Sequence, residues 1–166
     1  MLTVTLDTGT LRLTDALAML DGLAVHIATT TVTAREVEGT GWAAKAGQIP
    51  ALQESWVLGE SVLGAAVWGS QADSDRFERL LLLLSGGGVP TRDKRNTLTN
   101  GERHLLRDAA ILSTHAREGR DLFVSDDTKA IGHQGSELRA RLLSELGIRA
   151  MTLAEFRDYA DTLRPV

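Results

Sequence analysis

Short aliphatic runs alternate along this chain with segments that have the period of an amphipathic helix. Residues 2–6 and 24–28 have the pattern of buried strands, and a helix-like segment follows each of them, from Thr14 and over 31–39. Strands that alternate with helices form a parallel sheet covered by helices, because a connection between parallel strands needs the length of a helix. The sequence therefore predicts an α/β fold, with three α/β/α layers around a central, mostly parallel sheet.

Four further helix-like segments and two further apolar runs follow after residue 70. The expected helices are 73–84, 100–118, 135–146 and Leu153–Thr162, and the expected strands are 122–125 and 148–151. We expect Asn100 to cap the longest of these helices and Gly119 to end it. Because no repeat or linker divides the 166 residues, the chain is predicted to be a single domain, 1–166.

The segment 41–100 matches no pattern that we can assign as a whole. The apolar runs around Trp56 and Trp68 predict two short strands or a hairpin, because their glycine and β-branched content disfavours a long helix. These two side chains and Trp42 are expected to pack in the core, and a protein interface is the alternative. We therefore treat 41–100 as an elongated middle segment of the same domain.

Composition excludes several classes of site. The chain has no cysteine, which excludes disulfides, thiolate zinc sites and cysteine nucleophiles. The leucine run at 80–84 is far too short to span a bilayer, and no signal-peptide pattern follows Met1, so we expect a cytoplasmic protein with no membrane partner. The net charge of −4 does not indicate a nucleic-acid binder, although a local basic rim can matter more than the total.

Acidic residues occur at four places that such a sheet would bring together. Asp7 and the pair Asp126 and Asp127 follow apolar runs that have the pattern of strands, whereas Glu36 and Asp108 lie in helix-like segments. Carboxylates that lie close together repel, so a cluster of them needs a cation or stays partly protonated. Mg²⁺ and Mn²⁺ prefer this oxygen-only environment. The sequence therefore predicts a site for a hard divalent cation.

The order of these acids and their neighbours resembles the PIN-domain family of metal-dependent ribonucleases. A strand ends in Asp7-Thr8 with Leu11 three residues on, a glutamate follows on the second helix, an Asp108-Ala109 step lies on a long helix, and a later strand ends in Ser125-x-Asp127. The resemblance covers nearly the whole chain and is strongest over 107–130. It implies a PIN-like fold and a hydrolase that cleaves RNA phosphodiester bonds with water activated by Mg²⁺ or Mn²⁺.

The resemblance also implies a role for each acid. It assigns catalysis and metal binding to Asp7, Glu36, Asp108 and Asp127, with Glu38 as the alternative to Glu36 and with Asp126 as a neighbour that shares or replaces the metal-binding role of Asp127. Thr8 and Ser125 are expected to hydrogen-bond and orient a neighbouring carboxylate, and plain turn stabilisation is the alternative. His104 and His115 are expected to be ordinary surface or half-buried residues of the helix, and a role of His104 beside the metal site is the alternative.

RNA is the partner that the resemblance implies first, and a homodimer and an antitoxin-like protein are further candidate partners. An acidic pocket repels a polyanion, so RNA binding needs cations near the acids. The densest basic group before Asp108 is expected to supply this contact with the substrate, and it consists of Arg92, Lys94, Arg95, Arg103 and Arg107.

Two departures and three alternatives accompany the resemblance. Gly9 stands where the family often has asparagine, and 41–100 is longer than in small members. The main alternative is a PIN-like RNA- or protein-binding module with weak or no cleavage. A haloacid-dehalogenase-like phosphatase is a minor alternative, because it needs a second aspartate where Gly9 stands. The step from Asp7 to Gly9 also matches aspartic proteases, but these are all-β proteins, which the expected helices exclude.

Overall fold

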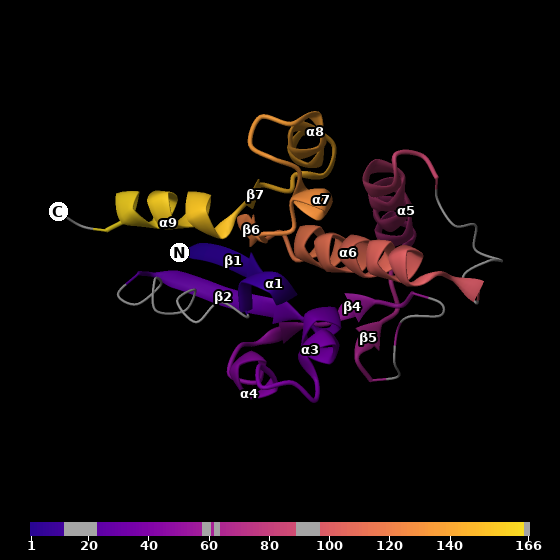
Figure 1. The fold of residues 1–166 in the computed structure, drawn as a ribbon, viewed down its shortest axis with the longest axis horizontal. Coiled ribbons are helices and arrows are strands. Elements are labelled where there is room, and N and C mark those ends of the chain that lie inside the picture. Colours follow the sequence, from indigo (N-terminus) through magenta and orange to yellow (C-terminus); the bar gives the residue numbers. More distant parts are fainter. Residues whose placement is uncertain (12–22, 58–60, 62–63, 89–96, 165–166) are drawn as a thin grey trace.

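A central sheet of parallel strands organises the molecule (Figure 1). The computed structural model describes residues 1–11, 23–57, 61, 64–88 and 97–164. The sheet has five strands in the order β3-β2-β1-β6-β7, and every adjacent pair is parallel. The strands are β1 (Leu2–Leu6), β2 (Val25–Thr30), β3 (Ala51–Leu52), β6 (Leu122–Val124) and β7 (Ala150–Met151). The predicted α/β fold with a parallel sheet is therefore confirmed.

Helices occupy the connections between these strands, as crossovers between parallel strands require. The described helices are α1 (Thr8–Leu11), α3 (Thr31–Val37), α4 (Ala43–Ala46), α5 (Gln71–Ser85), α6 (Asn100–Arg117), α7 (Thr128–Ile131), α8 (Glu137–Leu146) and α9 (Leu153–Thr162). In Figure 1, α6 runs from the middle of the molecule toward α5, while α9 lies on the opposite side of the view.

The two faces of the sheet build two hydrophobic cores, because successive side chains of a strand point to opposite faces. In β6, Phe123 packs with residues of α5, α6 and α8, whereas Leu122 and Val124 pack in a second core with residues of β1 and α9. All three side chains are almost fully buried. The helices therefore lie on both faces of the sheet, in agreement with the expected three layers.

The helix α6 is the longest described element, and its first turn differs from the expectation. Thr99, rather than Asn100, is the N-cap: its side chain accepts from the Glu102 N–H, and the Glu102 carboxylate accepts in return from the Thr99 N–H at 2.7 Å. This reciprocal pair satisfies two N–H groups at the helix start that would otherwise be unpaired. The predicted cap is wrong by one residue because both positions carry good capping side chains.

The middle segment contains more regular structure than the sequence indicates. Two short strands are present: β5 (Ala66–Val67) lies within the apolar run at Trp68, whereas β4 (Glu54–Ser55) lies just before the run at Trp56. They pair in parallel, which excludes a hairpin. The short helix α4 and the strand β3 were not predicted, because elements of two to four residues are too short to show periodicity. The helix expected from Thr14 lies outside the described residues. None of the helices in the described ranges combines the length and the apolar character that a membrane span requires.

His115 is more buried than expected. It lies on α6, is 1% exposed, places Nδ1 2.9 Å from Thr5 Oγ1 on β1, and packs edge-on against Phe123. Burial, with the nearby Arg120 charge, lowers the pKa of His115 to about 4. The folded protein therefore holds this imidazole neutral at a pH where the unfolded chain protonates it.

The lowered pKa of His115 predicts that the protein loses stability in acid. Because its folded pKa lies below the unfolded value, the loss begins as the pH falls through about 6.5 and is complete below about 4, where it reaches roughly 3 kcal/mol. We expect the free-energy difference between wild type and His115→Gln, measured by urea unfolding, to change by roughly 2 to 3 kcal/mol between about pH 7 and about pH 4.5. The exposed His104 offers the control, His104→Gln. An unchanged difference would show that His115 titrates normally.

Candidate active site

The candidate site lies where the order of the strands reverses. From β1 the chain adds β2 and β3 on one side, and β6 and β7 lie on the other side. Beyond the carboxyl ends of β1 and β6 the connections therefore diverge, and open parallel sheets generally bind ligands at such a point. Asp7 follows β1 directly, and Ser125, Asp126 and Asp127 follow β6.

Hydrogen bonds fix the relative position of these two strand ends. The Asp7 N–H donates to Val124 O at 3.0 Å, and Thr10 Oγ1 donates to the same carbonyl at 3.1 Å, so the turn into α1 is anchored on β6. Ser125 Oγ donates to Asp7 Oδ2 at 2.7 Å and accepts from the Asp127 N–H at 3.0 Å. Ser125 therefore connects two of the predicted acids.

Glu36 approaches the same place from α3. Its Oε2 accepts from Thr8 Oγ1 at 2.5 Å, and its Oε1 lies 3.9 Å from a guanidinium nitrogen of Arg107 on α6. Glu36 and Arg107 also line a small cavity of about 100 Å³ together with Val32 and Arg35. The guanidinium of Arg107 on α6 therefore lies next to Glu36.

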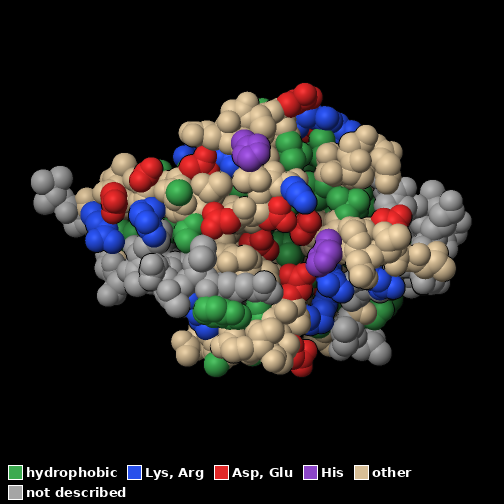
Figure 2. All heavy atoms as spheres, in the orientation of Figure 1, with side chains coloured by type: hydrophobic (Ala, Val, Ile, Leu, Met, Phe, Trp, Pro, Cys, Tyr) green, Lys and Arg blue, Asp and Glu red, His purple; other side chains and the backbone are tan. Residues whose placement is uncertain are grey.

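Asp108 joins the group from α6, where its pKa is affected by the charges of the other three acids. Burial, followed by the negative charges of Asp7, Asp127 and Glu36, raises the pKa of Asp108 to about 7. Burial also raises the pKa of Asp7, against the opposing effect of its hydrogen bond from Ser125. Figure 2 shows acidic side chains gathered near the centre of this face, with basic side chains around them.

The donor set fits a hard divalent cation, because it consists of carboxylate oxygens that burial and repulsion make costly to ionise together. Within the described part of the chain, however, no group of three or more histidine or acidic side chains stands arranged to hold a metal ion. Three of the acids have other partners: Asp7 has Ser125, Glu36 has Thr8, and Asp127 accepts from the Lys129 N–H at 2.9 Å as the cap of α7. Side-chain rotation would be needed to bring them onto one ion.

The remaining predicted residues lie outside this group or outside the described residues. Asp126 Oδ1 accepts from the Leu153 N–H at 2.8 Å and so supports the start of α9. Glu38 is exposed and caps the end of α3. Arg103 is half-buried on α6, one turn before Arg107. Of the predicted basic group, Arg92, Lys94 and Arg95 lie outside the residues that the structure describes.

One ion pair beside the site was missed by the sequence analysis. Arg35, next to Glu36 on α3, pairs with Glu54 of β4, whose side chain is 1% exposed. The second carboxylate oxygen of Glu54 has no hydrogen-bond partner among the described residues. No sequence signal could have paired the two, because Glu54 falls in the middle segment that has no assignable pattern.

Comparisons with protein-family models, with curated proteins and with solved structures find no match for this chain. The functional interpretation therefore depends on the geometry of the site and on the resemblance of its motifs.

Proposed function

We propose that this protein is a ribonuclease with a PIN-like fold that depends on Mg²⁺ or Mn²⁺. The observation that carries the proposal is the meeting of Asp7, Glu36, Asp108 and Asp127 at the reversal point of a parallel sheet, with the pKa of Asp7 and of Asp108 raised. Such a group is costly to keep ionised at neutral pH without a cation. A catalytic metal site gives a physical reason for this arrangement, and an ordinary surface cluster does not.

The residues of the site would have different roles in this reaction. The four carboxylates would hold the cation, and Thr8 and Ser125 would keep Glu36 and Asp7 in orientation through their hydroxyl groups. A bound divalent cation supplies a water of lowered pKa and stabilises charge on the phosphate. Arg107 would attract the phosphate from the side of α3.

A PIN-like module that binds RNA or protein with weak or no cleavage is the second candidate. It is favoured by one observation, that no three acids among the described residues stand arranged to hold a metal ion. Calorimetric titration with Mn²⁺ separates the candidates, because a binding module has no need of the cation. Binding that Asp7→Asn abolishes supports the nuclease.

Cleavage of single-stranded RNA tests the proposal directly. We expect wild-type protein to cleave in Mn²⁺ or Mg²⁺ and to stop in EDTA. Loss of a residue that only orients a metal ligand lowers activity by about 10- to 100-fold, and we expect Ser125→Ala to fall in this range. Asp7→Asn and Asp127→Asn each remove a proposed metal ligand and should lower activity by at least about 100-fold. The matched control is Asp75→Asn, because Asp75 is exposed on α5 and, within the described part of the chain, accepts a hydrogen bond only from Gln71 of the same helix. Cleavage by Asp7→Asn at the wild-type rate would refute the assignment.

A further inference from the structure

A second cavity lies on the other side of α6 from the sheet, between this helix, β4, β5 and the start of α5. Its volume is about 340 Å³, which is within the range of small-molecule sites. Most of its lining is apolar, and Trp56, Trp68, Phe77 and Ala110 contribute to it. None of the acids proposed for catalysis lines it, so it is separate from the site described above.

Two indoles form one wall of this cavity. Trp56 and Trp68 stack with their ring centroids 5.8 Å apart and their planes 26° from parallel. Trp68 is 88% exposed, so most of its side chain is open to solvent. An indole held in this position offers a flat apolar face for another ring, and its exposure is unfavourable until that face is covered.

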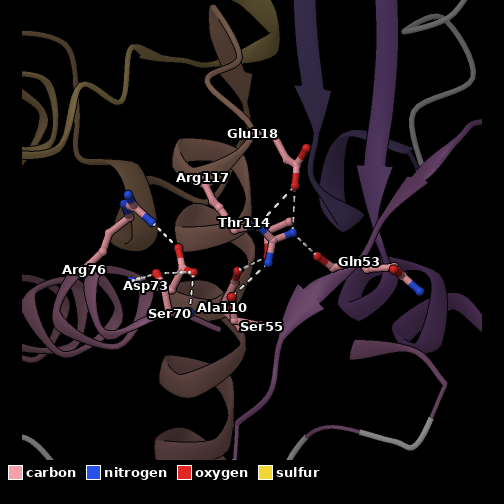
Figure 3. A network of polar contacts seen from close by, with 9 residues as sticks. All are labelled: Gln53, Ser55, Ser70, Asp73, Arg76, Ala110, Thr114, Arg117 and Glu118. Atoms are coloured by element: carbon pink, nitrogen blue, oxygen red, sulfur yellow. Dashed lines mark hydrogen bonds and ion pairs between the residues drawn. The ribbon is translucent and has the colours of Figure 1, made fainter. Parts of the chain in front are cut away.

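The backbone that carries Trp68 is held firmly in spite of this exposure. A Cβ at Gly69 would lie 3.2 Å from the Cβ atoms of both Ser55 and Asp73, so the chain passes close to β4 and α5 at this point. Figure 3 shows how these neighbours are fixed: Arg117 of α6 donates to Ser55 Oγ at 2.8 Å, and Asp73 lies between Ser70 and Arg76. The chain beside Trp68 is therefore packed against β4 and α5, and β4 is hydrogen-bonded to α6.

Charge and hydrogen bonding limit what the cavity can hold. Its described lining contains the carboxylates of Asp73 and Glu78 and no lysine or arginine, which disfavours a phosphate. Ser113, also in the lining, is 3% exposed, and its hydroxyl has no hydrogen-bond partner among the described residues. A buried hydroxyl without a partner is costly, and a ligand with a polar edge can satisfy it. An uncharged planar ring with polar edge atoms meets these conditions.

We propose that this cavity binds an unpaired nucleobase of single-stranded RNA. The proposal rests on the proposed function for the identity of the polymer, and on the tryptophans and Ser113 for the base. Every base has a face that stacks on an aromatic ring, and its ring nitrogens and carbonyls can pair with a hydroxyl. The helix α6 connects the two sites: Ser113 follows Asp108 by about 7.5 Å along the helix axis and by about 140° around it, so the two sites lie on different sides of this helix. An RNA strand that is cleaved beside Asp108 would have to pass around α6 to place one of its more distant bases on Trp68.

Adenosine is the first probe, because it lacks a phosphate and so has no charged group that the acids would repel or a metal would attract. The chain has three tryptophans, and only Trp56 and Trp68 line the cavity. We expect millimolar adenosine, in EDTA, to shift the indole N–H signals of Trp56 and Trp68 in an NMR spectrum and to leave that of Trp42 unchanged. Equal shifts of all three signals, or none, would overturn the proposal.

Variants provide the second measurement, with single-stranded oligoadenylate and with an abasic oligonucleotide of equal length in EDTA. Trp68→Ala should weaken oligoadenylate binding about tenfold, and leave abasic binding and the salt dependence unchanged, since the stack adds no phosphate contact. Ser113→Ala should weaken oligoadenylate binding a few-fold. The same change should raise the thermal stability of the free protein, because it removes an unpaired hydroxyl. The exposed Leu143→Ala on α8 is the control and should change nothing.

The outcomes separate this proposal from the nuclease. Base-dependent binding that Trp68→Ala removes supports the cavity as a base site even if the protein never cleaves RNA. Cleavage that depends on Asp7, with the same affinity and KM in Trp68→Ala, supports the nuclease and overturns the base site. A wild-type dimer that Trp68→Ala dissociates, with unchanged RNA affinity, would show instead that Trp68 forms a protein interface.

Discussion

Replacing Asp108 by asparagine should make the metal-free protein more stable and at the same time remove its response to Mn²⁺. The pKa of Asp108 is raised to about 7, so the folded state resists ionisation that the unfolded chain allows. For an acid with a raised pKa, the cost is absent below about pH 4, grows as the pH rises, and is complete above about pH 7. At about pH 8 this cost is of order 4 kcal/mol, and Asp108→Asn should recover much of it.

Mn²⁺ should reduce this difference in stability. A cation that binds only the folded protein at about 100 times its dissociation constant stabilises it by about 2.7 kcal/mol, and Asp108→Asn should lose most of this gain. Urea unfolding at about pH 4 and about pH 8, in EDTA and in Mn²⁺, measures both effects. The buried His115 contributes equally to wild type and variant, so it cancels in their difference. A variant that is less stable than wild type in EDTA at about pH 8 would contradict the clustering of the acids.

The second large effect is expected at the buried ion pair beside the site. Arg35→Met should destabilise the protein by about 3 to 5 kcal/mol at neutral pH, because it leaves the Glu54 carboxylate buried without its cation. The Glu54 N–H also donates to Thr31 Oγ1 at 3.1 Å, so both the backbone and the side chain of Glu54 join β4 to α3. Adding Glu54→Gln to Arg35→Met removes the uncompensated charge and should restore much of the stability.

An exposed ion pair provides the comparison for this test. Arg79 pairs with Glu145 at 2.5 Å between α5 and α8, and its side chain is 46% exposed. Arg79→Met should cost at most about 1 kcal/mol, because exposed pairs contribute little. Urea unfolding of the four proteins measures the contrast. Similar losses for Arg35→Met and Arg79→Met would mean that water reaches Glu54 in the folded state.

The pattern of the sequence was sufficient for the α/β fold with a parallel sheet and for the selection of two of the four acids. Asp7 and Asp127 could be selected because each follows an apolar run that ends as a strand, and strand ends of a parallel sheet meet at one edge. Glu36 and Asp108 could be selected only through the resemblance, since helices carry acidic residues routinely. Their mutual effect on pKa depends on distances that no sequence spacing states.

Other features could not be predicted because they join distant parts of the chain. The order of the strands places β6 beside β1 across more than a hundred residues, and the sequence has no local signal for such a pairing. Trp68 was expected in the core, with a protein interface as the alternative, but it is 88% exposed. Its neighbourhood is set by the parallel pairing of β4 and β5, which two-residue strands do not reveal in sequence. The basic group at Arg92, Lys94 and Arg95 remains a prediction.

The position of β1 between β2 and β6 has a consequence for the synthesis of the chain. The first half can pair β1 with β2, and β2 with β3, as it leaves the ribosome, but the other edge of β1 stays open until β6 at Leu122–Val124 has emerged. Ser125, which holds Asp7, arrives 118 residues after it. Contacts between such distant residues form late in folding, because closing the long loop precedes any gain from the contact. A nascent chain therefore lacks the assembled acid group until most of its length has been made.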